Sequence, residues 1–246
     1  MNNILITGGN RGIGLAISKK LIDEGFYVIS VSREINSNLK NIENFEQISA
    51  DVSSEVSCID LFEKLKNQNK KFYCIINNAG FSEWRSISQI DQTFLEKMFG
   101  VNVFGYFYII KYGLELLNDK GSILNISSLA AMRGTENNSA YVASKFAIRG
   151  LTQSLSKELG PKGIRVNAIN PVLIATEGLL KALKSDQSPA KDNPEEFLRV
   201  FATAQTSLKR LPNADDVADL ACFLIGPKSQ AITGQSINVD CGVLPN

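Results

Sequence analysis

The amino-acid sequence predicts a single α/β domain, in which helices cover both faces of a doubly wound parallel sheet of about seven strands. Apolar, β-branched runs alternate with amphipathic helical patterns along all 246 residues. Several runs, such as Ser122–Ser127, are nearly continuous in apolar residues, as is typical of strands buried on both faces. No repeat, low-complexity segment or Pro/Ser/Gly-rich linker divides the chain, so residues 1–246 are expected to form one domain.

The expected elements begin and end with each periodic pattern. Strands are predicted at Asn3–Thr7, Tyr27–Ser32, Glu46–Asp51, Phe72–Asn77, Ser122–Ser127, Arg165–Asn170 and Ser236–Asp240. Helices are predicted at Gly12–Glu24, Val56–Asn67, Ile87–Phe99, Val101–Leu117, Ser139–Leu159 and Asp215–Leu224. The connection between Arg33 and Asp51 is short and rich in asparagine, so a helix there is expected to be curtailed or missing.

The segment at about 177–209 differs from the rest of the chain. It is polar, contains Pro189 and Pro194, and carries a broken helical pattern. It is predicted to be a mobile flap over the functional site, because such flaps are drawn from weakly packed segments. A plain surface insertion is the alternative.

Composition limits the classes of partner. Lys and Arg total 26 and Asp and Glu total 25, a balance that argues against a nucleic-acid partner. The longest apolar stretch, Val101–Ile110, is far shorter than the roughly 20 residues of a membrane-spanning helix. The chain opens on a strand, so no secretory signal is expected. The four cysteines are far apart, as in reduced proteins, and a cytoplasmic location is therefore expected.

Histidine is absent from the sequence. Its absence excludes Ser-His-Asp hydrolysis, Cys-His proteolysis and histidine-based zinc sites, and no metal site is predicted. Proton transfer near neutral pH would have to use a perturbed Tyr, Lys, Cys, Asp or Glu.

A glycine cluster follows the first predicted strand. Gly8, Gly12 and Gly14 form a G-x-x-x-G-x-G pattern between that strand and an amphipathic helix. The bare N-terminus of such a helix attracts phosphate through its backbone N–H groups. The pattern therefore predicts a Rossmann-type dinucleotide site, with a plain glycine-rich turn as the alternative.

Tyr141 and Lys145 lie four residues apart in a predicted helix, so they share one face. A nearby ammonium favours the tyrosinate, and the pKa of Tyr141 is therefore expected to be lowered, giving a plausible acid/base pair. On its own such a Tyr-x-x-x-Lys pair is more often structural than catalytic. Ser128, just after a predicted strand, could donate a hydrogen bond to a carbonyl oxygen. The adjacent Ser127 competes for this role, but strand alternation would point it to the opposite face.

Taken together, these motifs resemble those of the short-chain dehydrogenases/reductases over nearly the whole chain. The shared motifs are Thr7-Gly8-x-x-x-Gly12-x-Gly14, Asp51-Val52, Asn77-Asn78-Ala79-Gly80, Val101-Asn102, Ser128, Tyr141-x-x-x-Lys145, Pro171 with Thr176, Ile232-Thr233-Gly234 and Asp240-Cys241-Gly242.

The resemblance implies roles for four residues in the interconversion of a carbonyl and a secondary alcohol. Tyr141 would be the general acid/base and Ser128 would polarise the substrate carbonyl. Lys145 would lower the pKa of Tyr141 and bind the nicotinamide ribose. Asn102, near the start of a predicted helix, would hold a water that links Lys145 to solvent.

The end of the second strand predicts the cofactor NADP(H) rather than NAD(H). Ser32 stands where NAD-selective relatives carry an aspartate, and Arg33 and Arg11 offer guanidinium groups to a 2′-phosphate. Glu34 weakens this prediction, and both arginines could instead be solvated surface charges. The expected cofactor-binding residues are Gly8, Asn10, Arg11, Gly12, Ile13, Gly14, Ser32, Arg33, Asp51, Val52, Asn78, Ala79, Gly80, Tyr141, Lys145, Pro171, Ile174 and Thr176.

The substrate is less determined. The most similar branch includes the 3-oxoacyl-carrier-protein reductases, so a 3-oxoacyl thioester is the specific expectation. Those enzymes usually present two basic residues to the carrier protein; Lys162 fits one position, but Asp119 stands at the other. The flap is also longer than in that branch, which suits a smaller substrate, such as a cyclic, sugar-like or secondary-metabolite ketone. A non-catalytic nucleotide-sensing or scaffold protein is the alternative of another class.

Helices 101–117 and 139–159 carry more apolar and aromatic residues than one buried face needs, including Phe104, Tyr106, Phe107 and Tyr108. With the family resemblance, this surplus predicts a homotetramer, or a homodimer, built on these two helices. A second interface is expected at Ile232–Asn238.

Overall fold

The computed structural model describes residues 2–191 and 193–245. Its seven strands form one parallel sheet in the order β3-β2-β1-β4-β5-β6-β7, which confirms the predicted fold class. The chain leaves β1 for one edge of the sheet and returns at β4, so the order reverses between these strands. Ligands bind beyond the carboxyl ends of the strands at such a switch point. The strands are β1 (Asn3–Thr7), β2 (Tyr27–Ser32), β3 (Phe45–Ser49), β4 (Phe72–Asn77), β5 (Leu117–Ile126), β6 (Arg165–Pro171) and β7 (Ser236–Val239).

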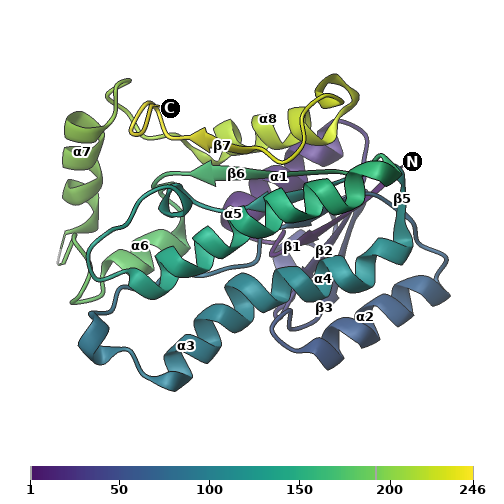
Figure 1. Cartoon of the computed structure of the whole chain (residues 1–246), viewed down its shortest axis with the longest axis horizontal. Coiled ribbons are helices and arrows are strands. Elements are labelled where there is room, and N and C mark those ends of the chain that lie inside the picture. Colours follow the sequence, from purple (N-terminus) through teal and green to yellow (C-terminus); the bar gives the residue numbers. More distant parts are fainter. Residues whose placement is uncertain (1, 192, 246) are drawn as a thin grey trace.

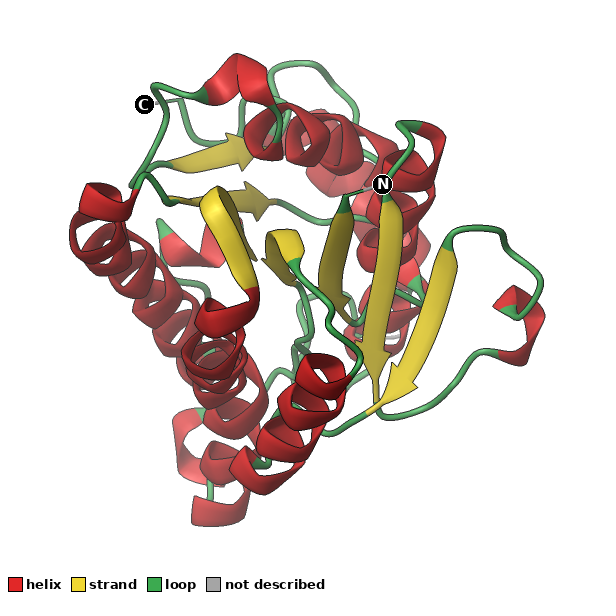
Figure 2. Ribbon diagram, turned by 90° about the vertical axis from the view of Figure 1, so that its right-hand side faces the viewer, coloured by secondary structure: helices red, strands yellow, loops and turns green. Residues whose placement is uncertain are grey.

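Two layers of helices enclose the sheet (Figures 1 and 2). Residues alternate between the two faces along each strand, and in β1 Leu5 packs on one side while Ile4 and Ile6 pack on the other. The two apolar cores that result explain why the strands read as nearly continuous apolar runs. One face is covered by α1 (Gly12–Asp23) and α8 (Ala214–Ile225), and the other by α2 (Glu55–Asn67), α4 (Gly105–Gly113) and α5 (Ser139–Leu159).

The helices predicted at 87–99 and 101–117 are differently bounded in the structure. Residues 87–89 form a separate 3-10 turn, and α3 (Gln92–Phe99) begins after Asp91, whose carboxylate accepts the Phe94 N–H at 2.7 Å. The backbone then continues through a π-helical turn, Gly100–Phe104, directly into α4. Gly100 keeps a helical backbone and so does not end the helix, contrary to the sequence pattern.

The connection after β2 contains only a 3-10 turn, Ser37–Leu39, which confirms that a helix is missing there. The predicted flap contains two helices, α6 (Glu177–Leu183) and α7 (Pro194–Gln205). Leu183 and Leu198 of these helices pack on Trp84, in an apolar cluster separate from the two main cores. Whether the segment moves stays a prediction.

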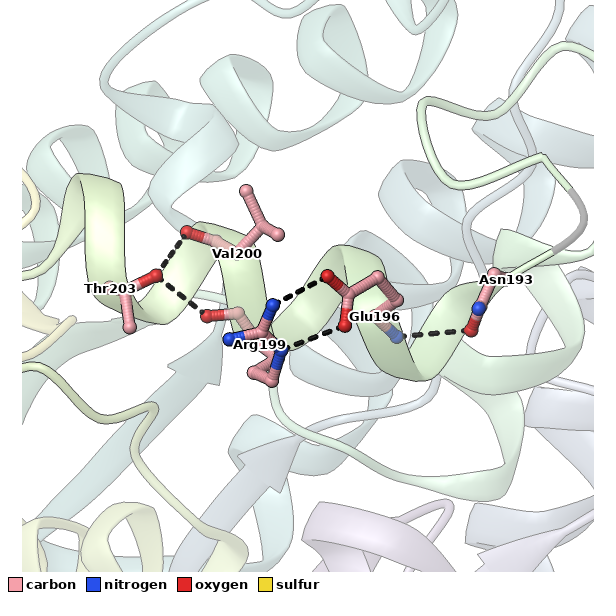
Figure 3. A network of polar contacts seen from close by, with 5 residues as sticks. All are labelled: Asn193, Glu196, Arg199, Val200 and Thr203. Carbon is pink, nitrogen blue, oxygen red and sulfur yellow. Dashed lines mark hydrogen bonds and ion pairs between the residues drawn. The ribbon is translucent and has the colours of Figure 1, made fainter.

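Figure 3 shows why α7 is polar in sequence yet regular in structure. Asn193 caps its N-terminus by accepting the Glu196 N–H, and Glu196 pairs with Arg199 one turn later. Thr203 donates to the carbonyl oxygens of Arg199 and Val200. These groups lie on the exposed face, whereas Leu198 is buried. In the described part of the chain, no helix combines the length and apolar character needed to cross a membrane.

Arg165 at the start of β6 ties the sheet to the C-terminus of α8. Its guanidinium donates to the carbonyl oxygens of Leu224 (2.6 Å), Ile225 (3.0 Å) and Gly226 (3.4 Å). A cation at a helix C-terminus also interacts favourably with the helix dipole.

We therefore expect Arg165→Met to lower the free energy of unfolding by about 2 kcal/mol, because charged hydrogen bonds to these carbonyls are lost. Urea denaturation measures this difference. Lys64→Met, at an exposed position on α2, is the control and should change stability by less than about 0.5 kcal/mol. Equal stabilities of the Arg165 variant and the wild type would contradict this role.

Candidate active site

The glycine turn lies at the carboxyl end of β1 and requires glycine at three positions. Gly8 and Gly12 have φ angles of +66° and +53°, which side chains other than glycine rarely adopt. A Cβ atom on Gly14 would lie 2.1 Å from the Gly8 carbonyl oxygen and 2.5 Å from Asn78 Nδ2. The first helical residues of α1 have no side-chain cap from Arg11. The turn thus keeps helix N–H groups free for an anion and fits the pyrophosphate of a dinucleotide.

Asn78, after β4, holds this turn in place. Its Nδ2 donates to the carbonyl oxygens of Thr7 (2.9 Å) and Gly8 (3.1 Å). In return, Thr7 Oγ1 accepts the N–H groups of Asn78 (3.0 Å) and Ala79 (2.9 Å). Asn78 therefore fixes the conformation of the turn with its side chain.

Gly80 continues this surface toward the middle of the site. A Cβ atom there would lie 3.7 Å from Lys145 Nζ and 3.2 Å from Asn102 Oδ1. The exposed backbone of Gly80 consequently runs next to the ammonium, and the turn and Lys145 lie along one edge of the sheet.

Lys145 is only 4% exposed. Its ammonium donates to the Ile126 carbonyl oxygen at 3.2 Å and lies 5.7 Å from the ring centroids of both Tyr106 and Tyr141. Burial lowers the pKa of Lys145 from its ordinary 10.5 to about 8. The group therefore remains mostly protonated at pH 7, but less firmly than an exposed lysine.

Tyr141 is half-buried, one turn before Lys145 on α5. Burial raises the pKa of Tyr141 above its ordinary value of 10, and the hydrogen bond with Ser128 opposes only part of this effect. The sequence-based expectation of a lowered pKa is therefore wrong for this structure. The Lys145 ammonium donates to a backbone carbonyl, and the loss of solvation on burial decides the direction.

The two serines after β5 point in different directions, as the alternation of strand residues predicts. Ser127 is buried, and its Oγ donates to the Lys145 carbonyl oxygen at 3.4 Å. Ser128 begins a 3-10 turn, accepts the Ala130 N–H at 3.1 Å, and is the serine whose hydroxyl lowers the pKa of Tyr141. Ser128, not Ser127, is therefore the serine that acts on the phenol.

Asn102 lies inside the π-helical turn, not near a helix start, because α3 and α4 are continuous. Its Oδ1 accepts the Phe81 N–H (3.0 Å) and its Nδ2 donates to the Phe81 carbonyl oxygen (2.9 Å). Nδ2 also lies 3.2 Å from Ser144 Oγ, which donates to the Tyr141 carbonyl oxygen. π turns often occur at functional sites, and this one joins the loop after β4 to the backbone of Tyr141.

Ser144 and Phe81 were missed by the sequence analysis. Ser144 stands inside the Tyr141-x-x-Ser144-Lys145 motif, so its place in the sequence could have drawn attention to it. Phe81 contributes backbone atoms only, for which the residue type gives no signal.

The remaining predicted residues border the turn or support it. Thr176 caps α6, and its Cγ2 would lie 3.4 Å from a Cβ on Gly12. Asn10 is buried and donates to the Glu34 carbonyl oxygen, and Asp51 accepts Ser53 N and Oγ. Ile13 and Ser32 are half-buried; Val52, Pro171 and Ile174 are buried; Arg11 and Arg33 are exposed.

Asp119 and Lys162 do not lie near the site. Asp119 lies near the amino end of β5 and Lys162 lies just before β6, where Lys120 is next to Gly163. Since parallel strands place their amino ends at the opposite edge from their carboxyl ends, these residues give no information on a carrier protein at the site.

The described residues contain no group of His, Cys, Asp and Glu side chains that could hold a metal ion.

Comparison with known proteins agrees with this arrangement. Residues 8–244 match the family model described as enoyl-(acyl carrier protein) reductase. L-2,3-butanediol dehydrogenase of Corynebacterium glutamicum is 32% identical, with 98% of each chain covered. The chain belongs to the short-chain dehydrogenase/reductase family. It is accordingly an oxidoreductase that acts on CH–OH and C=O groups with a nicotinamide cofactor.

Other members of the short-chain dehydrogenase/reductase family share its structure and sequence. A short-chain dehydrogenase family protein of Francisella tularensis is 29% identical, with a TM-score of 0.90 and coverage of 99% of this chain and 98% of that one. The 3-ketoacyl-(acyl-carrier-protein) reductase of Brucella melitensis, solved with NADH, is 27% identical, with a TM-score of 0.84 and 98% of each chain covered. L-xylulose reductase of Caenorhabditis elegans is 32% identical, covering 99% of this chain and 96% of that protein.

The buried ammonium of Lys145 makes a testable contribution to stability. Its folded-state pKa of about 8 lies below the ordinary 10.5, so the unfolded chain binds this proton more tightly. The buried charge of Lys145 destabilises the folded state fully below pH 8, and this destabilisation disappears as pH rises toward 10.5.

We expect Lys145→Met to raise the free energy of unfolding at pH 7 by roughly 2 kcal/mol, a burial penalty of about 3 kcal/mol less the lost hydrogen bond to Ile126. Denaturant unfolding at pH 7 and pH 10 measures the difference, which should shrink at the higher pH. A variant that is less stable than the wild type by the same amount at both pH values would contradict the buried-charge assignment.

Proposed function

We propose that this enzyme is an NADP(H)-dependent reductase that interconverts a small hydroxyketone, diketone or sugar-like ketone and the corresponding secondary alcohol. The observation that carries the proposal is the meeting of Ser128, Tyr141 and Lys145 beside the exposed backbone of Gly80, on the same sheet edge as the glycine turn. This arrangement of proton donor, hydrogen-bond donor and cation supports an enzyme rather than a nucleotide-sensing or scaffold protein.

The raised pKa of Tyr141 suits it to act as an acid. At neutral pH the phenol keeps its proton and can deliver it to the alkoxide formed on reduction of a carbonyl. Ser128 donates a hydrogen bond to the carbonyl oxygen and stabilises the developing negative charge. A bound nicotinamide cofactor supplies or accepts the hydride.

Lys145 provides a positive charge next to Gly80, where the nicotinamide ribose is expected to bind. Asn102 fixes Phe81 and, through Ser144, the backbone of Tyr141, so it positions the acid. A water near Asn102 that resupplies protons to Lys145 stays a prediction.

The substrate class is supported by the relatives. L-2,3-butanediol dehydrogenase and L-xylulose reductase, both 32% identical, are named for a small diol and a sugar. A diacetyl reductase of Staphylococcus aureus is equally identical over 97% of this chain. Helices α6 and α7, which pack on Trp84, would enclose such a substrate.

A 3-oxoacyl thioester remains the second candidate. The description of the family model and the Brucella melitensis neighbour favour it. In this chain, however, the predicted carrier-docking positions Asp119 and Lys162 lie at the far edge of the sheet and give it no support.

NADP(H) is proposed because of the charges around the end of β2. Arg11 and Arg33 are exposed, and within residues 2–191 and 193–245 neither forms an ion pair. Ser32 replaces the carboxylate that would repel a 2′-phosphate. NAD(H) is the less favoured alternative.

A homotetramer, with a homodimer as the alternative, is proposed for the assembly in the cytoplasm. Phe104 at the end of the π-helical turn is 48% exposed, Phe107 on α4 is 50% exposed and Phe146 on α5 is 42% exposed. Burial of these rings against a partner would remove a costly apolar surface from water. Tyr106, by contrast, is buried and donates to the Ile126 carbonyl oxygen, so it belongs to the core and not to the predicted surplus.

Removal of the acid should abolish catalysis without loss of cofactor binding. Tyr141→Phe is expected to reduce the rate of diacetyl or L-xylulose reduction at least about a hundredfold, and Ser128→Ala by a similar factor. NADPH oxidation measures the rate, and NADPH fluorescence measures binding. Ser127→Ala, which alters only the buried neighbour, should keep the rate within about twofold. A Tyr141→Phe variant with wild-type activity would refute the assignment.

The cofactor preference should depend on the two arginines. Arg33→Ala and Arg11→Ala are each expected to weaken NADPH binding about tenfold and to leave NADH binding nearly unchanged, because only NADPH carries the 2′-phosphate. Fluorescence titration with both cofactors checks this. Lys19→Ala, an exposed position on α1, is the control. Equal affinity of the wild type for NADH and NADPH would exclude the proposal.

A further inference from the structure

The connection after β2 is fixed by Asn36. Each of the four polar atoms of this residue has a partner. Its backbone N–H donates to Gln47 Oε1 and its carbonyl oxygen accepts from Gln47 Nε2, both at 2.9 Å. Its Nδ2 donates to the Asn10 carbonyl oxygen at 3.1 Å, and its Oδ1 accepts the Asn38 N–H at 3.1 Å.

Gln47 lies on β3, the edge strand of the sheet, and its side chain is half-buried. Its carboxamide pairs with both backbone groups of Asn36, as a neighbouring strand would. Asn36 in turn reaches the glycine turn through the Asn10 backbone. We call Asn36 and Gln47 the amide clamp, because together they join β3 to the glycine turn.

The backbone just before the clamp is held from the same two sides. The Arg33 carbonyl oxygen accepts from Ser49 Oγ of β3 at 2.9 Å. The next carbonyl oxygen, that of Glu34, accepts from Asn10 Nδ2 of the glycine turn at 2.7 Å. One of these two successive peptide groups is therefore held by β3 and the other by the glycine turn. These bonds order the connection, which lacks a helix of its own.

This connection begins with Arg33, and the glycine turn to which it is joined contains Arg11. Both guanidinium groups are exposed, so packing of their own side chains does not set their separation. The separation is set by the backbone, and the bonds between Asn10, Glu34 and Asn36 are those that link the two backbone segments.

We infer that Asn36 and Gln47 are positioning residues that fix the backbone of Arg33 relative to that of Arg11 and so set the preference for a phosphorylated adenosine ribose. The inference rests on the proposed use of NADP(H). Neither residue needs to touch the cofactor. Because a preformed pair of cations loses less conformational freedom on binding, the clamp favours the 2′-phosphate and has little effect on a ligand without one.

The test uses 2′,5′-ADP and ADP as probes. Both contain adenosine and two phosphates, but 2′,5′-ADP carries one on the 2′ and one on the 5′ oxygen, whereas ADP carries both on the 5′ side. Each affinity is compared with that of the wild type for the same probe. Isothermal titration with the full chain should show that Gln47→Met and Asn36→Ala each weaken 2′,5′-ADP binding about fivefold to tenfold. ADP binding should change less than about twofold. In steady-state assays the KM for NADPH should rise by the same factor at unchanged kcat.

Asn41→Ala is the matched control, because Asn41 is an exposed asparagine in the same connection. It should leave both affinities unchanged. Gln47→Glu keeps the acceptor for the Asn36 N–H and should fall between Gln47→Met and the wild type.

Two failures are distinguishable. If Arg33→Ala and Arg11→Ala do not change the ratio of 2′,5′-ADP to ADP affinity, the proposed use of NADP(H) fails. If the arginine variants change this ratio but the clamp variants weaken both probes equally, or neither, the clamp is only structural and the inference is overturned.

Discussion

The buried ammonium of Lys145 is the constraint around which the site is organised. Its pKa of about 8 and its bond to the Ile126 carbonyl oxygen place a weakly solvated positive charge at the carboxyl end of β5. The Tyr106 hydroxyl donates to the same oxygen at 2.7 Å, so two donors from different helices meet on one strand end. A chain without histidine thereby holds both a cation and a phenol at the carboxyl end of β5, along the same sheet edge as the glycine turn.

The loop after β4 packs next to the buried ammonium of Lys145. A Cβ at position 80 would lie only 3.2 Å from Asn102 Oδ1, and Asn102 holds the loop that follows Gly80 by both backbone groups of Phe81. The same loop begins with Asn78, which fixes the glycine turn. One short connection after β4 consequently joins the glycine turn to Asn102, and under the proposed function a change in its backbone would disturb both dinucleotide binding and proton transfer.

Much of the fold could be predicted from the sequence, because buried parallel strands and the glycine turn leave strong local patterns. The continuous helix through Gly100 could not be predicted, because a glycine between two apolar patterns looks like the end of a helix. The regular helix α7 was also not predicted, because Glu196 and Arg199, whose charges lie on its exposed face, make the segment look polar in sequence. In the site, the motif residues come together along one edge, but the direction of the Tyr141 pKa depends on burial depth, which residue spacing does not encode.

The central claim is that Lys145 carries a buried proton that is held less tightly than that of an exposed lysine. An NMR titration of the enzyme labelled with 13C-lysine measures it directly through the Cε chemical shifts. One lysine should titrate near pH 8, well below the others, and its signal should be missing in Lys145→Met. A spectrum in which every lysine titrates near its ordinary value would contradict the account.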